Sequence, residues 1–273
     1  MLFRSAAAQP DAIHIATEGP LGMAARWYCK VRKRSIPHNT SYHTKYPEYM
    51  KIHYGVPVGL GYWLLRLFHK FSHRVLVTTT TLEKEMRSHS FENLVVWSRG
   101  VDGKIFNPDS RRQNLAGKPV LVCVSRVSKE KNLDAFCALE TAGTKILVGD
   151  GPYLEELKKR YPNVIYTGYK SGANLAHYYA NADVFVFPSR SDTFGVVMLE
   201  SIACGTPVAA YPVTGPVDVI TPGVNGFLDE DLNTAIEKCL ELDRAIVQQS
   251  SKTFTWSACT DVDRKSTRLN SSH

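Results

Sequence analysis

Residues 184–211 have the sequence VFVFPSRSDTFGVVMLESIACGTPVAAY. The apolar run 184–187 predicts a buried strand, residues 194–204 have helical composition, and the apolar run 208–211 predicts a second strand. A strand, a helix and a strand in this order form a βαβ unit, in which the two strands are parallel. The polar loop 189–193 then lies at the carboxyl end of a strand, which is where parallel sheets bind ligands.

Two acidic residues flank the start of that helix, Asp192 in the loop and Glu200 within the helix. A helix start presents unpaired N–H groups and a positive dipole end, which together bind anions. This part of the chain can therefore hold an anion on main-chain amides and place two carboxylates against hydroxyl groups. The same local pattern also fits an N-cap aspartate followed by a surface glutamate, so the rest of the chain has to decide.

The composition indicates a soluble globular protein. The chain has 273 residues, of which 44% are hydrophobic and 22% charged, and this length fits one large or two ordinary domains. The six cysteines are scattered and form no C-x-x-C pair, which predicts reduced, buried thiols in a cytoplasmic protein rather than disulfides or a zinc site. We find no secretory signal, and no apolar run reaches the roughly 18 residues of a membrane span.

The positive charge is unevenly distributed. The net charge is +7, and residues 26–74 contain ten lysines or arginines against one acid, Glu48. Aromatic and apolar residues stand beside this charge in residues 62–70. The segment predicts a surface for anionic lipid headgroups, which would make the protein peripheral at the inner face of the membrane, although a solvated basic face has the same composition. No nucleic-acid recognition motif is present, so we do not expect nucleic acid as a partner.

Strands and helices alternate regularly in residues 118–260, with one of the helices expected over 132–142. This alternation predicts a doubly wound α/β domain. Residues 1–102 also alternate but are too few for a complete domain of that kind, and residues 103–117 form a polar, turn-rich linker. The polar residues 261–273 do not continue the pattern, and we expect a non-native, disordered tail there.

Four motifs, in this order, resemble those of the retaining, nucleotide-sugar-dependent glycosyltransferases of the two-domain GT-B type. They are an interdomain connection at 98–102 with 106–108, a diphosphate-binding loop at 125–132, a Gly-Pro turn at 148–152 and a paired-carboxylate motif at 192–200. The family usually has glutamate at the position of Asp192, whose side chain is shorter by one methylene. Residues 18–22, 40–44 and 46–49 are similar to a narrower group, the bacterial enzymes that move mannose or another hexose onto lipid or polyprenol-type acceptors.

The resemblance implies an α/β protein of GT-B architecture whose C-terminal Rossmann-like domain is complete or nearly so. Family members begin with several βα units before the position of Glu18, so we expect an N-terminal, acceptor-side domain truncated by about 80 or more residues. The implied activity is transfer of a hexose, mannose or glucose, from a nucleotide sugar to a lipid or saccharide acceptor with retention of configuration. The nucleotide sugar is a substrate, and we expect neither a cofactor nor a metal.

The chemistry of such a donor explains the residue types. Negative charge grows on the β-phosphate as the nucleoside diphosphate leaves, so fixed cations and amides aimed there are the main catalytic device. Arg126 and Lys131 follow a strand and are five residues apart, which lets one loop bring both to a diphosphate. By the resemblance, the other catalytic residues are His43, which faces the cleft from the first domain, and Asp192, which binds donor-sugar hydroxyls. The same resemblance assigns donor binding to Glu200 (on the ribose hydroxyls), Phe194, Gly195, Thr193, Gly149, Asp150, Gly151 and Tyr169.

Two other functions fit parts of the sequence. A nucleotide-sugar 2-epimerase would use the same fold and convert the sugar nucleotide with no acceptor present. A basic fragment that binds lipid or nucleic acid without activity would explain residues 26–74 alone. The residue types around Asp150 and Tyr169 do not separate a uridine from a guanosine donor, so GDP-mannose and UDP-glucose both remain open.

Overall fold

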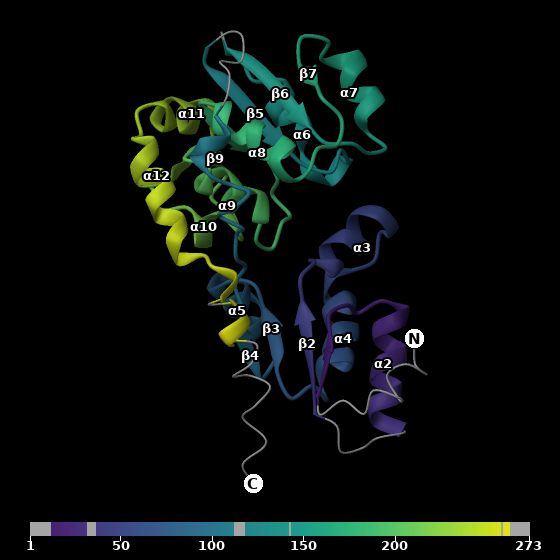
Figure 1. The fold of residues 1–273 in the computed structure, drawn as a ribbon. Helices are drawn as coiled ribbons and strands as arrows, with labels where there is room; N and C mark the ends of the chain where they lie inside the picture. Colours follow the sequence, from purple (N-terminus) through teal and green to yellow (C-terminus); the bar gives the residue numbers. More distant parts are fainter. Residues whose placement is uncertain (1–11, 32–36, 112–117, 142, 258, 263–273) are drawn as a thin grey trace. The chain divides into compact units, whose positions relative to one another are not determined.

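The computed structural model describes residues 12–31, 37–111, 118–141, 143–257 and 259–262. The chain divides into two compact units (Figure 1). The first unit is formed by residues 1–98 with 257–273, and the second by residues 99–256. Each unit contains one parallel sheet, with helices in the connections between its strands.

The first unit contains a four-stranded parallel sheet in the order β1-β2-β3-β4. Its elements are, in chain order, Ile13–Ile15 (β1), Pro20–Val31 (α2), His38–Tyr42 (β2), Tyr46–Tyr54 (α3), Val58–His69 (α4), Val75–Val77 (β3), Thr80–Ser88 (α5) and Leu94–Val96 (β4). Tyr62 and Leu65 of α4 and Leu82 and Met86 of α5 pack into one core with the side chains of β3. Their spacing of three and four residues is that of the apolar face of an amphipathic helix.

The second unit contains a six-stranded parallel sheet in the order β10-β9-β8-β5-β6-β7. Its strands are Val120–Val124 (β5), Thr144–Val148 (β6), Ile165–Tyr166 (β7), Val184–Phe187 (β8), Val208–Ala210 (β9) and Gly226–Leu228 (β10). Its helices are Leu133–Cys137 (α6), Leu154–Arg160 (α7), Gly172–Asn181 (α8), Val196–Ala203 (α9), Pro216–Val219 (α10), Leu232–Leu240 (α11) and Arg244–Ser250 (α12), with short 3-10 helices at Pro108–Ser110, Lys129–Lys131 and Ser251–Thr253. The predicted doubly wound α/β fold is confirmed.

Alternate side chains of β5 enter two separate cores on the two faces of the sheet. Val120, Val122 and Val124 pack with side chains of α8, α9 and α12. Leu121 and Cys123 pack with side chains of α6, α7 and α11. A strand that is apolar on both faces is typical of a parallel sheet covered by helices on each side, as Figure 1 shows for this unit. This double burial explains why the strand is a continuous apolar run instead of an alternating one.

Helix α6 is shorter than the sequence predicts. We expected a helix over 132–142, but it ends at Cys137. Lys145 on β6 donates hydrogen bonds to the carbonyl oxygens of Cys137 and Leu139, at 2.5 and 2.8 Å, and so satisfies groups that a helix end leaves unpaired. At the other end, Asn132 has a φ of 53° and precedes the helix instead of joining it.

Part of the predicted linker contributes to the core of the second unit. Phe106 is buried there, and its ring packs edge-on against that of Tyr179, with 6.0 Å between the ring centroids. Residues 112–117 of the same predicted linker lie outside the described residues. The buried ring of Phe106 therefore anchors this polar, turn-rich segment. The average composition of the segment does not reveal this anchor.

The end of the chain is helical as far as it is described. Residues 259–262 are helical and belong to the first unit, so the first two residues of the predicted tail are part of a helix. Trp97 donates a hydrogen bond from Nε1 to the carbonyl oxygen of Cys259 at 2.9 Å, which ties this helix to the end of β4. Residues 263–273, the remainder of the predicted tail, lie outside the described residues.

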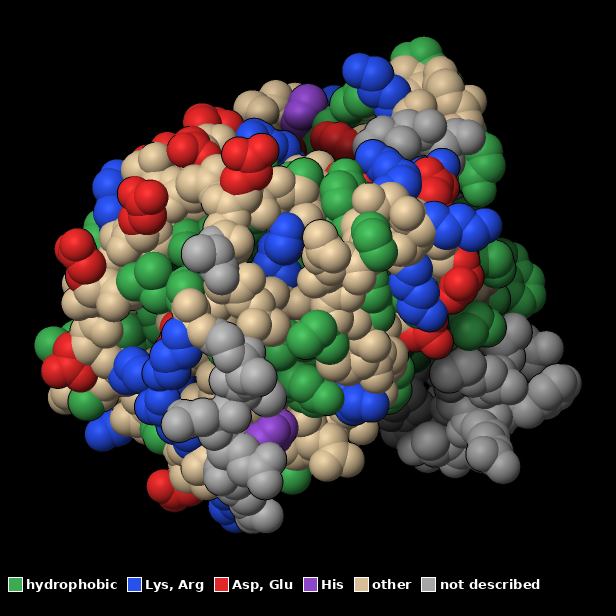
Figure 2. All heavy atoms as spheres, turned by 90° about the horizontal axis from the view of Figure 1, so that it is seen from above, with side chains coloured by type: hydrophobic (Ala, Val, Ile, Leu, Met, Phe, Trp, Pro, Cys, Tyr) green, Lys and Arg blue, Asp and Glu red, His purple; other side chains and the backbone are tan. Residues whose placement is uncertain are grey.

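Basic and acidic side chains lie close together on the surface. On the face shown in Figure 2, lysine and arginine side chains stand beside aspartate and glutamate side chains. Within the described ranges, no helix is both long enough and apolar enough to cross a bilayer.

All six cysteines are free and buried, as predicted. Burial raises the pKa of the Cys204 thiol to about 12, with a further contribution from the Glu200 carboxylate, so this thiol stays protonated.

Candidate functional site

Strands β5 and β8 are neighbours in the sheet of the second unit, although β6 and β7 lie between them in the sequence. After β5, the next two strands, β6 and β7, extend the sheet on one side of β5. The strands β8, β9 and β10 then extend it on the other side. Such a reversal leaves a crevice at the carboxyl ends of the two strands, and doubly wound sheets bind ligands there. The loop 125–132 follows β5 and the loop 188–195 follows β8, so both lie at this crevice.

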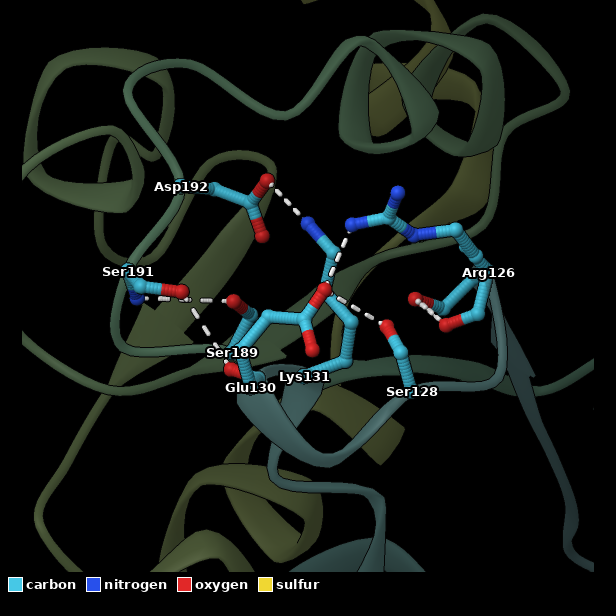
Figure 3. A network of polar contacts seen from close by, with 8 residues as sticks. Arg126, Ser128, Glu130, Lys131, Ser189, Ser191 and Asp192 are labelled. Carbon is cyan, nitrogen blue, oxygen red and sulfur yellow. Dashed lines mark hydrogen bonds and ion pairs between the residues drawn. The ribbon is translucent and has the colours of Figure 1, made fainter. Parts of the chain in front are cut away.

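Glu130 organises the loop that follows β5 (Figure 3). Its carboxylate accepts hydrogen bonds from the Ser128 hydroxyl at 2.7 Å and from the Arg126 guanidinium at 2.5 Å. Burial raises the pKa of Glu130, but the hydrogen bonds from Ser128 and the main chain, together with the charge of Arg126, lower it by more, so the carboxylate is ionised at neutral pH. The Arg126 side chain remains 64% exposed, and a ligand can therefore reach its guanidinium.

An ion pair joins the loops that follow β5 and β8. The ammonium of Lys131 lies 2.6 Å from Oδ1 of Asp192, and the two side chains are only 20% and 22% exposed (Figure 3). A second link is made by the Ser191 hydroxyl, which donates to the carbonyl oxygen of Glu130 at 3.2 Å. The structure thus brings together two residues that the sequence predicts to bind different parts of a donor, the diphosphate and the sugar.

Asn132 shapes the loop after β5 and connects it to the end of β8. Asn132 adopts the left-handed conformation, with φ 53° and ψ 37°, so the chain turns sharply directly after the lysine. Its side-chain amide donates to the carbonyl oxygen of Pro188, at 3.0 Å, at the end of β8. The same residue therefore shapes one loop and attaches it to the other.

The Gly-Pro turn after β6 packs its backbone directly against the loop after β5. Gly149 has a φ of 147°, and a Cβ there would lie 1.8 Å from the carbonyl oxygen of Ser125. Gly151 has a φ of 156°, and a Cβ there would lie 2.3 Å from the carbonyl oxygen of Val127. The Val127 amide in turn donates to the carbonyl oxygen of Asp150 at 2.9 Å. Both predicted donor-binding glycines are thus required for the close approach of the two loops.

The helix after β8 begins two residues later than the sequence predicts. We expected it to start at Phe194, but α9 starts at Val196, because Gly195 precedes it with a non-helical φ of 81°. The side chain of Phe194 is buried in the core at 5% exposure, so only its main chain can face a ligand. Thr193 is also buried. The amides of Phe194 and Gly195 therefore belong to the loop, and the first turn of the helix lies beyond them.

Glu200 lies within α9 and is partly buried, which distinguishes it from an ordinary surface glutamate. Its Oε2 accepts a hydrogen bond from the hydroxyl of Tyr179 at 2.9 Å. Burial raises the pKa of Glu200, and the hydrogen bond from Tyr179 partly opposes that rise. A carboxylate with one oxygen engaged in this way keeps a second oxygen that can accept hydrogen bonds from hydroxyl groups.

Replacing Glu200 with glutamine is expected to stabilise the folded chain at neutral and alkaline pH. Since burial raises the pKa of this carboxyl, the stability linked to it is fully present below its unfolded pKa of about 4.3 and is lost as the pH rises through the folded pKa. The uncharged amide avoids this loss and can still accept from Tyr179. Scanning calorimetry should therefore find a higher melting temperature for E200Q than for the wild type at pH 8 and no difference near pH 4. Equal melting temperatures at pH 8 would contradict the expectation.

His43 directly follows β2 in the first unit and is partly exposed. Its ring centroid lies 5.9 Å from that of Trp97, which lies 5.4 Å from that of His14. These rings stand together near the carboxyl ends of the strands of the first sheet. The other three predicted catalytic residues belong to the second unit, so the participation of His43 in their site stays a prediction.

Sequence reasoning missed side chains that hold the site in place. They are Ser128, Glu130, Ser191 and Tyr179. Ser128 and Glu130 lie within the loop 125–132 that the sequence analysis singled out, so these two were within reach of the sequence. Tyr179 gives no such signal, because it meets its partner only through tertiary packing. Tyr169, which we expected beside the base, is 73% exposed in the turn after β7.

The crevice combines two cations and two carboxylates in a small space. A guanidinium can bind a phosphate through two hydrogen bonds, whereas an ammonium acts as a point charge, and together they suit a diphosphate. In the part of the chain that the structure describes, no group of three or more His, Cys, Asp or Glu side chains is arranged to hold a metal ion.

Models of two protein families match this chain. The model described as glycosyl transferases group 1 matches residues 118–243, and the model described as glycosyltransferase family 4 matches residues 1–104. A GDP-mannose-dependent alpha-mannosyltransferase of Corynebacterium glutamicum is 31% identical over 93% of this chain and 66% of the relative. A sulfoquinovosyl transferase of Arabidopsis thaliana is 30% identical over 92% of this chain and 55% of the relative. The chain thus spans less than two thirds of the length of these curated relatives.

Two solved structures share the fold of this chain. A sucrose-phosphate synthase from Thermosynechococcus elongatus superposes with a TM-score of 0.80, at 24% identity, over 96% of this chain and 76% of its own. The Anabaena protein Alr3699/HepE, solved in complex with UDP and glucose, superposes with a TM-score of 0.76, at 20% identity, over 97% of this chain and 79% of its own. At these identities the likeness concerns the fold.

Proposed function

Because the chain belongs to the group 1 and family 4 glycosyltransferases, we propose that it transfers a hexose, mannose or glucose, from a nucleotide sugar to a lipid or saccharide acceptor. The observation that carries the proposal is the Lys131–Asp192 ion pair, which sets a phosphate-binding cation beside a hydroxyl-binding acid at the switch point of the sheet. Arg126 and Lys131 would bind the diphosphate, Asp192 the donor sugar and Glu200 the ribose. His43 would act from the first unit.

We propose retention of configuration at the transferred carbon, without a protein nucleophile. In this mechanism the acceptor attacks from the face that the diphosphate leaves, and the departing phosphate takes the acceptor proton. The role of the site is then electrostatic: fixed cations stabilise the charge that grows on the β-phosphate. The carboxylates of Asp192 and Glu200 serve binding, so they differ from the acid and nucleophile of a glycosidase.

Nucleotide sugars are expected to raise the melting temperature of the chain. A ligand that binds only the folded state stabilises it by mass action, by about 2.7 kcal/mol at one hundred times the Kd. A thermal-shift screen with GDP-mannose and UDP-glucose identifies the base and the sugar, with GMP and UMP as controls that lack the second phosphate. If no nucleotide sugar shifts the melting temperature more than its monophosphate does, the proposed donor site is wrong.

The epimerase alternative differs in one measurable respect. A 2-epimerase converts the sugar nucleotide with no acceptor present, whereas a transferase needs an acceptor to give a new glycoside. Incubating the chain with the donor alone and separating the sugar nucleotides by chromatography distinguishes the two. A new sugar nucleotide with an inverted 2-position would favour the epimerase.

We also propose that the first unit binds the anionic inner face of a membrane through α4. One face of this helix is buried in the core, but a second apolar stripe, exposed by 43–58%, consists of Leu60, Trp63, Leu64 and Leu67 of the helix and of Phe71, which follows its end. We call this set the exposed α4 stripe. Residues 58–74 contain no acid and several cations. An apolar stripe flanked by cations is typical of an interfacial helix and is not expected of a merely solvated basic face.

A cavity beside the exposed α4 stripe fits a headgroup phosphate. It has a volume of about 290 Å³, and it is lined by Arg66 of α4, by Lys70 directly after α4, and by Ser90, Glu92 and Asn93 from the loop after α5. Two cations one helical turn apart, with a hydroxyl and an amide opposite, offer hydrogen bonds to a phosphate, and Glu92 adds one opposing charge.

The Leu64→Glu variant is expected to lose most of its binding to anionic vesicles. A charge in the middle of the exposed α4 stripe opposes insertion into the acyl chains, while the site in the second unit is untouched. Co-flotation with vesicles of phosphatidylcholine that contain about one third phosphatidylglycerol measures this binding. Ile246→Glu, at an exposed position of α12 with similar exposure, is the matched control. Equal binding of both variants to the vesicles would exclude the membrane as the partner of the stripe. The same conclusion would follow if the wild type forms a dimer that the Leu64→Glu substitution dissociates.

A further inference from the structure

Tyr179 is a buried tyrosine whose hydroxyl has one functional neighbour. The residue is 0% exposed, and its hydroxyl donates to Oε2 of Glu200 at 2.9 Å. A phenol buried in an apolar core must find a hydrogen-bond partner, and here that partner is a carboxylate at the crevice. The contact links the interior of the second unit to a residue to which we assign donor binding.

The ring of Tyr179 is held from several sides. It packs edge-on against Phe106 at 6.0 Å and against Phe185 at 5.5 Å between ring centroids. The main chain of Tyr179 is fixed as well, because its carbonyl oxygen accepts from the Thr206 hydroxyl at 2.6 Å. Arg244 donates from Nη2 to the same hydroxyl oxygen at 2.8 Å. The phenol therefore presents its proton in one direction from a rigid support.

We infer that Tyr179 is a positioning residue, which fixes the carboxylate of Glu200 so that its remaining oxygen accepts hydrogen bonds from the two ribose hydroxyls of the nucleotide. The inference rests on the proposed function, because it needs a nucleotide in the crevice. A carboxylate that rotates freely in the unbound protein loses conformational entropy when it binds the ribose, and this weakens binding. A carboxylate that a neighbour already holds in place avoids this cost. Burial raises the pKa of Glu200, and the hydrogen bond from Tyr179 opposes that rise and so favours the ionised carboxylate.

The Tyr179→Phe variant removes the hydroxyl and keeps the buried ring. We expect about tenfold weaker binding of the ribonucleoside diphosphate, UDP or GDP, as for the loss of one hydrogen bond to a charged group, measured by calorimetry with the whole chain. Binding of the corresponding 2′,3′-dideoxy diphosphate should stay unchanged, since it lacks the hydroxyls that Glu200 recognises. The preference for the ribose form should also begin to fall at a higher pH than in the wild type, because Glu200 without Tyr179 takes up a proton more readily.

Two outcomes overturn the inference. If Tyr179→Phe weakens the ribose and dideoxy forms equally, the tyrosine is merely structural, and if it weakens neither, the contact has no role in binding. Tyr178→Phe, on the same helix, is the matched control and should leave both affinities unchanged. A Tyr179→Phe/Glu200→Gln double variant should bind no more weakly than Glu200→Gln alone, because the tyrosine acts through the glutamate. A wild type that binds neither diphosphate would instead contradict the proposed function itself, and with it the inference.

Discussion

The Lys131→Met variant is expected to turn over a nucleotide sugar about 10²–10³-fold more slowly than the wild type, by analogy with the loss of one fixed donor from an oxyanion site. Methionine keeps the length and most of the apolar stem of lysine but removes the charge that would meet the leaving phosphate. The loss should appear mainly in kcat, because the charge on the β-phosphate grows only as the transition state forms. Steady-state rates of donor hydrolysis or transfer measure it.

A structural cost must be separated from this catalytic one. Lys131→Met also leaves the partly buried Asp192 without its partner at 2.6 Å, which is expected to lower the free energy of unfolding by on the order of 1 kcal/mol. The double variant Lys131→Met/Asp192→Asn removes both charges and should regain that stability without regaining turnover. If the double variant recovers turnover along with stability, Lys131 holds the loops together and is not the catalytic cation.

Gly149→Ala is expected to have the largest effect on stability. The new methyl would have to sit 1.8 Å from the carbonyl oxygen of Ser125, in a backbone conformation that side chains disfavour. Adding the cost of a strained φ to that of a displaced strand end gives about 3–5 kcal/mol, which corresponds to a fall in melting temperature of roughly 10 °C. Calorimetry of the variant measures this loss, and nucleotide binding should weaken with it, because the loop that carries Arg126 must move.

The control for this variant is Gly103→Ala in the same unit. A Cβ at Gly103 would meet nothing within 4 Å, so the substitution should change the melting temperature by no more than a degree or two. A Gly149→Ala protein with wild-type stability would show that the turn after β6 can yield, and that its glycines are not required by the approach of the two loops.

Sequence reasoning works well where one residue pattern decides the outcome. The continuous apolar strands β5 and β8 were predictable because burial on both faces of a parallel sheet leaves no other composition. The turn at 148–152 was predictable from its glycines and proline, and the φ values of Gly149 and Gly151 are ones that glycine adopts without strain. In both cases the physical cause lies within a few residues of its effect.

The contacts that complete the site are not local, and the sequence could not predict them. Lys131 and Asp192 each fit a role toward a bound donor, and nothing in either segment indicates that they pair when no donor is present. The start of α9 was misplaced because Phe194 suits a helix by composition, while the core and the φ of Gly195 hold it outside one. The early end of α6 is likewise accompanied by a contact that the local sequence does not show, since Lys145 from the next strand satisfies carbonyl groups that the helix end leaves unpaired.

Each of the two cations at the crevice, Arg126 and Lys131, is paired with a carboxylate before any ligand arrives. Arg126 is matched by Glu130 and Lys131 by Asp192, so a phosphate that enters competes with a carboxylate for each cation. Free orthophosphate would leave Asp192 without its ion-pair partner and Glu130 with the Ser128 hydroxyl in place of the guanidinium. The nucleotide sugar that we propose as donor would offset this loss in part, because its phosphates would take the cations while its sugar hydroxyls would bind the released Asp192. Such an exchange would make the proposed site favour whole donors over their inorganic fragments.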